Sequence, residues 1–404
     1  MPLYGSVVTT GLSMLAAGLV SISLPWALIS AGQGASLAGL ASFALQIPVV
    51  LGLLLGGGLV ERVGPRRILI LSNLGALALV MAAAALAWLH PDRMLPLVAL
   101  LAVANLVGQP GTVAQDARVP ELARLAGVPL ERANGLRDIA VNLGLVGGPA
   151  LGVLLVDLAG VPLALGLAAV LLGIIALVDA LLFPAFAGKR RAADGRTGRP
   201  TGILADPLLR IVAIIGVMLV AVFAALDEIL VPALVVSAGL DGTRLALFLG
   251  LAAVAAMSAS GLYSAIGHRL PARRVFVGGV LVMAVGAVLL ASLPVAVGLI
   301  VAPVLIGLGV GPIWPLIVTA IQRRVAAADR GRLIASLSAV ILLAQPFAAL
   351  AAGPAVDALG TAIMTSAVAA LVILAALIAL FARGLGDLDD RPASLSRSSS
   401  AVEG

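Results

Sequence analysis

Long apolar runs alternate with short polar gaps along the chain, and this pattern predicts transmembrane helices. A helix needs about 20 apolar residues to cross about 30 Å of hydrocarbon, and most of the runs reach that length. The pattern therefore predicts an all-α polytopic membrane protein with twelve spans. The runs lie roughly at 6 to 30, 37 to 60, 67 to 89, 94 to 117, 135 to 157, 161 to 186, 208 to 237, 243 to 266, 274 to 292, 295 to 320, 333 to 357 and 360 to 382.

Positive charge is distributed unevenly among the gaps between these runs. Of the 25 Lys and Arg residues, 23 lie in every second gap or after residue 382, and the remaining gaps hold only Arg93 and Arg244. Cytoplasmic loops retain Lys and Arg during membrane insertion. We therefore expect a protein of the cytoplasmic (inner) membrane with both termini in the cytoplasm.

Composition agrees with this prediction. With 62% hydrophobic and 11% charged residues, the chain has too little polar surface for a water-soluble protein of its length. The net charge of +6 is spread over predicted cytoplasmic loops, so we expect contact with anionic lipid and none with nucleic acid. The chain contains no cysteine, which excludes disulfides and thiolate metal sites.

Two polar segments predict the domain organisation. Residues 189 to 206 are rich in Arg, Gly and Pro and are typical of a flexible linker, and the chain becomes polar and serine-rich after 385. We expect a six-helix bundle at 1–188, a cytoplasmic linker at 189–206, a second six-helix bundle at 207–385 and a disordered tail at 386–404.

Two internal repeats indicate that the halves are duplicated. The loop after the second run shares two glycines, a leucine and an arginine with the loop after the eighth run, at an offset of 203 residues. A second repeat relates the ends of runs five and eleven. The second pair of segments consists of Gly148, Pro149 and Asp157 against Gly353, Pro354 and Asp357, where both aspartates are expected to cap a helix or lie at an interface.

Three segments carry recognisable signatures. They consist of Gly57, Leu59, Glu61, Arg62, Gly64, Arg66 and Arg67; of Gly144, Gly148, Pro149 and Gly152; and of residues from Pro120 to Leu136. Together they resemble the major facilitator superfamily. The first is similar to the loop between its helices two and three, with Glu61 where Asp is usual and Pro65 where a basic residue is common. The second is similar to helix five of its proton-driven exporters, and the third to the loop between helices four and five in the branch of enterobactin exporters and macrolide efflux pumps.

The resemblance implies a fold of two pseudo-symmetric six-helix bundles that expose a central site to each side in turn. In the first segment it implies a latch that favours the outward-open state, with Glu61 facing the start of helix eleven near Arg332, and Asp116 in the same charge cluster. An ordinary interfacial loop remains the alternative. In helix five, the four-residue spacing of the glycines allows close helix packing, with or without a role in coupling.

Acidic residues inside the apolar runs are the sharpest indication of mechanism. A carboxylate near the bilayer centre costs about 2.5 to 3.5 kcal/mol, so such residues usually face a cavity and have a function. Asp227 and Glu228 are adjacent, and like charges in a buried setting favour retention of a proton. We expect this pair to exchange protons or to bind a cationic group, although one of the two could instead reach the outer interface. Asp179 is a second candidate.

The resemblance also nominates residues that line a central cavity. Only 3% of the residues are aromatic, so the cavity is expected to be aliphatic and to suit a small amphiphilic substrate. A tryptophan is as common at a membrane interface as in a ligand site. The nominated residues are Trp26, Asn105, Gln109, Asp227, Glu228 and Trp314.

The sequence argues against an enzyme. His90 and His268 both lie in predicted loops, and the chain lacks the HExxH, GxSxG and GxxxxGK[ST] motifs of metalloproteases, hydrolases and nucleotide-binding proteins. We therefore expect a monomeric secondary transporter that needs no cofactor and exports small amphiphilic molecules, such as drugs or siderophore-like metabolites, with the proton gradient as energy source. A flippase or uptake transporter of the same fold without proton antiport remains the alternative.

Overall fold

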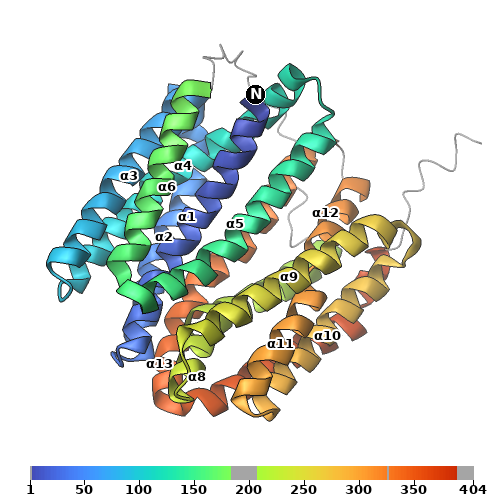
Figure 1. Cartoon of the computed structure of the whole chain (residues 1–404). Helices are drawn as coiled ribbons and strands as arrows, with labels where there is room; N and C mark the ends of the chain where they lie inside the picture. Colours follow the sequence, from blue (N-terminus) through green and yellow to red (C-terminus); the bar gives the residue numbers. More distant parts are fainter. Residues whose placement is uncertain (1, 183–206, 325–326, 389–404) are drawn as a thin grey trace, which may run out of the picture. The chain divides into compact units, whose positions relative to one another are not determined.

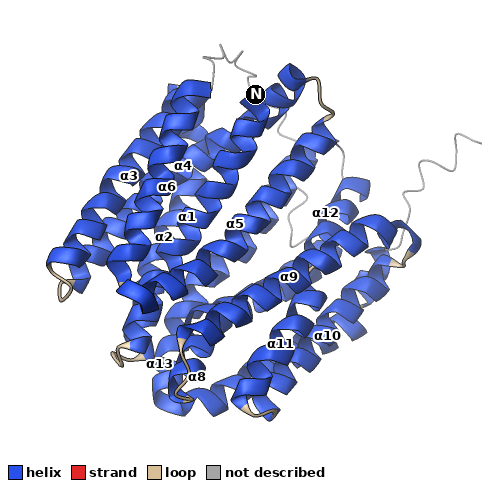
Figure 2. Ribbon diagram, viewed as in Figure 1, coloured by secondary structure: helices blue, strands red, loops and turns tan. Residues whose placement is uncertain are grey.

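The computed structural model describes residues 2–182, 207–324 and 327–388, and every regular element within these ranges is helical (Figures 1 and 2). The α-helices are α1 Pro2–Ser30, α2 Ala35–Val63, α3 Pro65–Leu89, α4 Met94–Ala126, α5 Leu130–Ala159, α6 Val161–Leu182, α7 Pro207–Ala225, α8 Val231–Ser237, α9 Gly242–Ile266, α10 Ala272–Ser292, α11 Val295–Val310, α12 Ile313–Arg324 and α13 Ala327–Phe381. A π-helix, η1, covers Leu226–Leu230, and the 3-10 helices η2 and η3 cover Gly267–Arg269 and Arg383–Leu388.

The described helices account for the predicted membrane spans. Eleven segments are long and apolar enough to cross a membrane, and the last of them, Ser336–Phe381, has 46 residues, about twice the length needed. Gly360 interrupts that segment with a non-helical backbone (φ 80°, ψ 163°), so the segment consists of two helices, one before and one after this residue. The break falls on the first residue of the predicted run at 360 to 382, directly after the run at 333 to 357. The polytopic, all-helical fold is confirmed.

The connection between α4 and α5 differs from the prediction. The polar residues from 118 to 134 were expected to form a loop, but only residues 127 to 129 lie outside the two helices. Charged side chains stabilise the helical ends instead, as in the ion pair of Arg124 with Glu121 three residues earlier. The turn between α2 and α3 is likewise shorter than expected. It consists of Gly64, with a φ of 95° that disfavours other residues, and Gly57 lies inside α2.

Contacts divide the described chain into two compact units. The first contains α1 to α6 together with Ala224–Gly250 and Gln345–Met364, and the second contains α7 as far as Phe223 and the described residues of Leu251–Ala344 and Thr365–Leu388. The first unit thus takes in η1, α8 and parts of α9 and α13, which belong to the second half of the sequence. The predicted linker at 189–206 and most of the tail at 386–404 lie outside the described residues. The division into two six-helix domains stays a prediction.

Helix α1 packs closely against α5 in the first unit, and the glycines of α5 account for the short distance. A Cβ atom added at Gly148 would lie 2.6 Å from the Leu15 carbonyl oxygen and 2.9 Å from the Gly18 Cα atom. One added at Gly152 would lie 2.7 Å from Ile22. Only residues without a side chain allow two helix backbones to approach this far. The packing of α1 on α5 therefore requires glycine at these positions.

Substitution of Gly148 by Ala is expected to destabilise the fold, because the new methyl group would force α1 and α5 apart. The expected loss is about 1 to 3 kcal/mol, the usual cost of overpacking. Gly147 provides the matched control, since a Cβ atom there would meet only Leu15 Cδ1 at an ordinary 3.5 Å. Thermal unfolding of both variants in detergent would test this, and equal stability of the Gly148→Ala and Gly147→Ala proteins would contradict it.

One polar contact occurs in the same form in both halves of the sequence. Arg66, at the start of α3, donates to the carbonyl of Ala180 in the last turn of α6 at 3.4 Å. Arg273, at the start of α10, donates to the carbonyl of Leu380 in the last turn of α13 at 3.2 Å. A cation is favourable at a helix C-terminus, where the carbonyls lack intrahelical partners. Each contact lies within one unit, and their correspondence supports a duplicated sequence.

Candidate functional site: carboxylates within the apolar helices

Asp227 and Glu228 lie in the π-helical turn η1, between α7 and α8. Pro232 explains the turn, because it lacks the N–H group that would bond the Glu228 carbonyl in an α-helix. The Val231 N–H donates instead to the carbonyl of Leu226, five residues earlier. Such π-turns are rare and occur frequently at functional sites. Glu228 is about 14 Å from the end of the span at Ser237, at 1.5 Å per residue.

The Glu228 carboxylate is held by side chains from two other helices, all within the first unit. Its Oε2 atom accepts a hydrogen bond from the Gln46 side chain of α2, and its Oε1 atom accepts one from Gln345 Nε2 of α13 at 3.3 Å. The buried hydroxyl of Ser42, one turn before Gln46, lies beside the same carboxylate. Both Asp227 and Glu228 are half-buried. The carboxylate is thus partly removed from water but not from polar partners.

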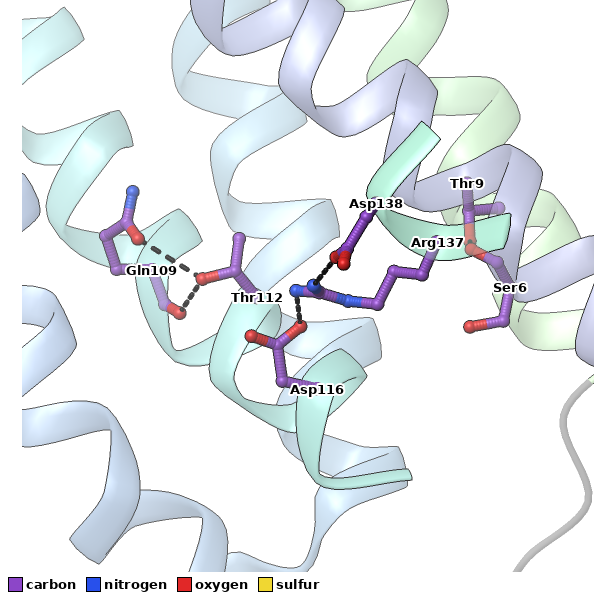
Figure 3. A network of polar contacts seen from close by, with 7 residues as sticks. All are labelled: Ser6, Thr9, Gln109, Thr112, Asp116, Arg137 and Asp138. Atoms are coloured by element: carbon purple, nitrogen blue, oxygen red, sulfur yellow. Dashed lines mark hydrogen bonds and ion pairs between the residues drawn. The ribbon is translucent and has the colours of Figure 1, made fainter. Parts of the chain in front are cut away.

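Asn105 and Gln109, the two residues of α4 predicted to line the cavity, both make hydrogen bonds. Asn105 donates to the carbonyl of Leu45 at 2.8 Å, next to Gln46, and so fixes α4 against α2 beside the carboxylate. The side-chain oxygen of Gln109 accepts from the Thr112 hydroxyl at 3.2 Å (Figure 3). The structure therefore brings Asn105 close to the Glu228 group, while Gln109 is bonded within its own helix.

Sequence reasoning missed Ser42, Gln46 and Gln345. These three residues lie on the second and eleventh predicted spans, from which no cavity residue was nominated. A signal was nevertheless present, because each is an isolated polar residue in an otherwise apolar run. A polar side chain within a span usually faces a partner or a cavity.

Asp179 belongs to a different site. It is fully buried on α6, where its Oδ2 atom accepts a hydrogen bond from Asn73 of α3 at 2.7 Å. Arg118 of α4 is 4% exposed and lies close enough to interact electrostatically with Asp179. This buried polar cluster brings together three helices of the first unit, α3, α4 and α6. Its arrangement provides a structural explanation for Asp179, and a role in proton exchange stays a prediction.

Asp116 belongs to a charge cluster between α4 and α5. Asp116 accepts a hydrogen bond from Arg137 of α5, which also lies 3.5 Å from Asp138 (Figure 3). These groups link α4 to α5. The side chains of Glu61 and Arg332 lie outside the described part of the structure, so the latch between them stays a prediction.

The two tryptophans nominated for the cavity have different surroundings. Trp26 is only 2% exposed, and its indole Nε1–H donates to Asp157 Oδ1 at 2.7 Å. Trp314 lies on α12 in the second unit and is 44% exposed. The Trp26 indole thus joins α1 to α5, whereas the Trp314 side chain is exposed on the surface of its unit.

Comparison with known proteins identifies the family. The sequence profile of the Major Facilitator Superfamily matches residues 7–269. The chain belongs to the Major Facilitator Superfamily. This superfamily member is 27% identical over 394 residues to the multidrug efflux pump Tap of Mycobacterium tuberculosis (strain ATCC 25618 / H37Rv), with 93% of this chain and 92% of the pump covered. It is 24% identical over 392 residues to Tap of Mycolicibacterium fortuitum, with 92% and 93% covered.

Solved structures show the same fold. The superfamily member matches the crystal structure of the nucleoside transporter NupG with a TM-score of 0.73 at 13% identity, over 94% of this chain and 98% of that one. As a member of this superfamily, the protein is a polytopic membrane transporter and not an enzyme. The prediction of the superfamily is confirmed, while membership of the branch with enterobactin exporters stays a prediction.

Proposed function

We propose that this superfamily member is a proton-coupled exporter of small amphiphilic molecules. It would lie in the cytoplasmic membrane with both termini in the cytoplasm and work by alternating access. Its mycobacterial relatives, similar over more than nine tenths of the chain, are multidrug efflux pumps. The scarcity of aromatic residues favours an aliphatic binding site for an amphiphilic cargo.

The observation that carries the proposal is the Glu228 carboxylate in its π-turn, held by amide groups from α2 and α13. A charged carboxylate accepts both amide hydrogens, and a protonated one accepts them less strongly. Loading a proton or a cationic substrate at Glu228 would therefore weaken its bonds to Gln46 and Gln345. Gln46 belongs to the first half of the sequence and Glu228 to the second, so the state of the carboxylate would influence how the halves associate.

Purified protein in liposomes with an entrapped pH-sensitive dye provides the direct test. A lipophilic cation of the kind used to assay multidrug pumps would be added on one side, and proton movement and cation movement would be recorded together. Proton-coupled export predicts opposite fluxes of cation and protons that both require the protein. Cation movement without protons would instead support a flippase or uptake transporter, and movement of neither would reject the proposed function.

A further inference from the structure

The end of the first unit opposite the N-terminus, here called the far end, joins helices from both halves of the sequence. Helix α1 ends there at Ser30 and α2 begins there at Ala35, while α5 ends there at Ala159 and α9 begins there at Gly242 (Figure 1). The part of α13 before Gly360 also belongs to this unit. The positive-inside pattern predicts that the far end faces the outside of the cell.

A five-residue pattern occurs twice at the far end, at an offset of 200 residues. Residues 156 to 160 read Val-Asp-Leu-Ala-Gly, and residues 356 to 360 read Val-Asp-Ala-Leu-Gly. Gly160 and Gly360 both have a φ of 80°, which is not a helical conformation and so ends the helix. Glycine suits both positions, because other residues rarely adopt a positive φ. Asp157 and Asp357 therefore occupy equivalent positions in the last turns of two corresponding helices.

Each of these carboxylates bonds to the first turn of a helix from the opposite half of the sequence. Asp357 accepts the backbone N–H groups of Ala35 at 2.9 Å and Ser36 at 2.8 Å, at the start of α2, and also the Ser36 hydroxyl. Asp157 accepts the N–H of Gly242, the first residue of α9, at 2.7 Å. These N–H groups have no acceptor within their own helices, and the helix dipole favours a negative charge beside them.

The surrounding packing is close, so these bonds depend on a closed far end. A Cβ atom added at Gly353 would lie 2.5 Å from the Ala35 carbonyl oxygen and 2.9 Å from the Ser36 Cα atom. On the other side, the second oxygen of Asp157 accepts the indole N–H of the buried Trp26. A separation of a few ångströms between α2 and α13, or between α5 and α9, would break the corresponding bonds.

We propose that Asp157 and Asp357 are a symmetric pair of clamps that hold the far end of the transporter closed. Each clamp joins the two halves through a carboxylate and a helix N-terminus, and both must release before the central site opens at the far end. The inference rests on the proposed alternating-access function. It assigns a gating role to two acids at the far end, separate from the Glu228 group.

Distance measurement between two spin labels tests the clamps in the full-length protein. The chain has no cysteine, so labels can be attached through cysteines introduced at Gln33 and Ala238 without further changes. Both positions are exposed, one in the turn between α1 and α2 and the other in the turn between α8 and α9. Asp157→Asn, Asp357→Asn and the double variant would be compared with Asp92→Asn, which neutralises an exposed acid in the turn between α3 and α4.

Each single clamp variant is expected to raise the ratio of open to closed far-end populations about fivefold, the usual effect of losing one helix cap. The double variant is expected to raise it about 25-fold, because the effects of two separate sites multiply. Asp92→Asn should leave the ratio unchanged. Gly353→Leu would calibrate the measurement, since its side chain must wedge α13 away from α2.

An unchanged distance distribution in the folded double variant would overturn the clamps, and so would an equal shift in Asp92→Asn. The readout is independent of transport. If the unmodified protein moved no protons in liposomes, the proposed exporter function would fail while the populations in the clamp variants still decided the gating role.

Discussion

Substitution of Glu228 by Gln is expected to reduce transport driven by a pH gradient to the level of vesicles that lack the protein. An amide neither takes up a proton nor carries the charge that holds Gln46 and Gln345, so the variant would be fixed in a neutral state. Glu228→Asp keeps a carboxyl group with a shorter reach and should retain part of the activity. Uptake of a fluorescent cation into inverted vesicles with an imposed pH gradient is the measurement.

Further variants separate the two carboxylates and the two functions considered for them. Asp227→Asn alone shows whether the neighbouring acid participates, and the Asp227→Asn, Glu228→Gln double variant should lack all gradient-driven transport. If Glu228 exchanges protons, its Gln variant should still exchange cation between equal concentrations without a gradient. If it binds the cation itself, this exchange should also be lost. Undiminished gradient-driven transport in the double variant would remove both residues from the mechanism.

Substitution of Arg118 by Leu is expected to lower the free energy of unfolding by about 3 to 5 kcal/mol, the usual cost of leaving a buried charge without its counterion. The carboxylate of Asp179 would then retain Asn73 as a partner but lose the neighbouring positive charge. Thermal unfolding in detergent would measure the loss. Arg124→Leu is a suitable control, because Arg124 lies in the same helix but is paired with Glu121 on an exposed surface.

A second substitution tests whether the loss comes from the electrostatic interaction between Arg118 and Asp179. The Arg118→Leu, Asp179→Leu double variant should recover much of the stability, since an apolar pair of similar volume can replace a buried ion pair. Additive losses would contradict the pairing. Asp179→Asn serves the functional question: normal gradient-driven transport in that variant would assign Asp179 to structure, whereas its loss would support the predicted role in proton exchange.

The inter-helix contacts suggest how the Glu228 site and the clamps could act together. Glu228 contacts α2 at Gln46, and Asp357 contacts the beginning of the same helix at Ala35 and Ser36. Gln345 and Asp357 both lie on the part of α13 that belongs to the first unit. A change of charge at Glu228 would therefore act on the two helices that one clamp joins. The Glu228→Gln substitution combined with the spin labels described above would show whether the far-end populations respond.

The sequence by itself determined the membrane spans, the superfamily and the intramembrane acids. These features are local: an apolar run of sufficient length must form a helix in lipid, because only a helix satisfies its own backbone hydrogen bonds there. A carboxylate such as Glu228 is conspicuous in such a run whatever surrounds it. The break at Gly360 also lies where two predicted apolar runs meet. This feature is local too, because a glycine readily adopts the non-helical backbone that ends a helix.

Only the tertiary structure decided which polar groups are partners. Gln46 and Glu228 are 182 residues apart, and Asp357 and Ala35 are 322 apart, so no local pattern relates them. The polar residues from 118 to 134 predicted a loop, but most of them lie in α4 and α5. A helix can continue beyond its apolar run where its charged side chains reach water. Asp179 shows the same limit, since its sequence context matches that of a functional acid and only its burial against Asn73 and Arg118 provides a structural explanation.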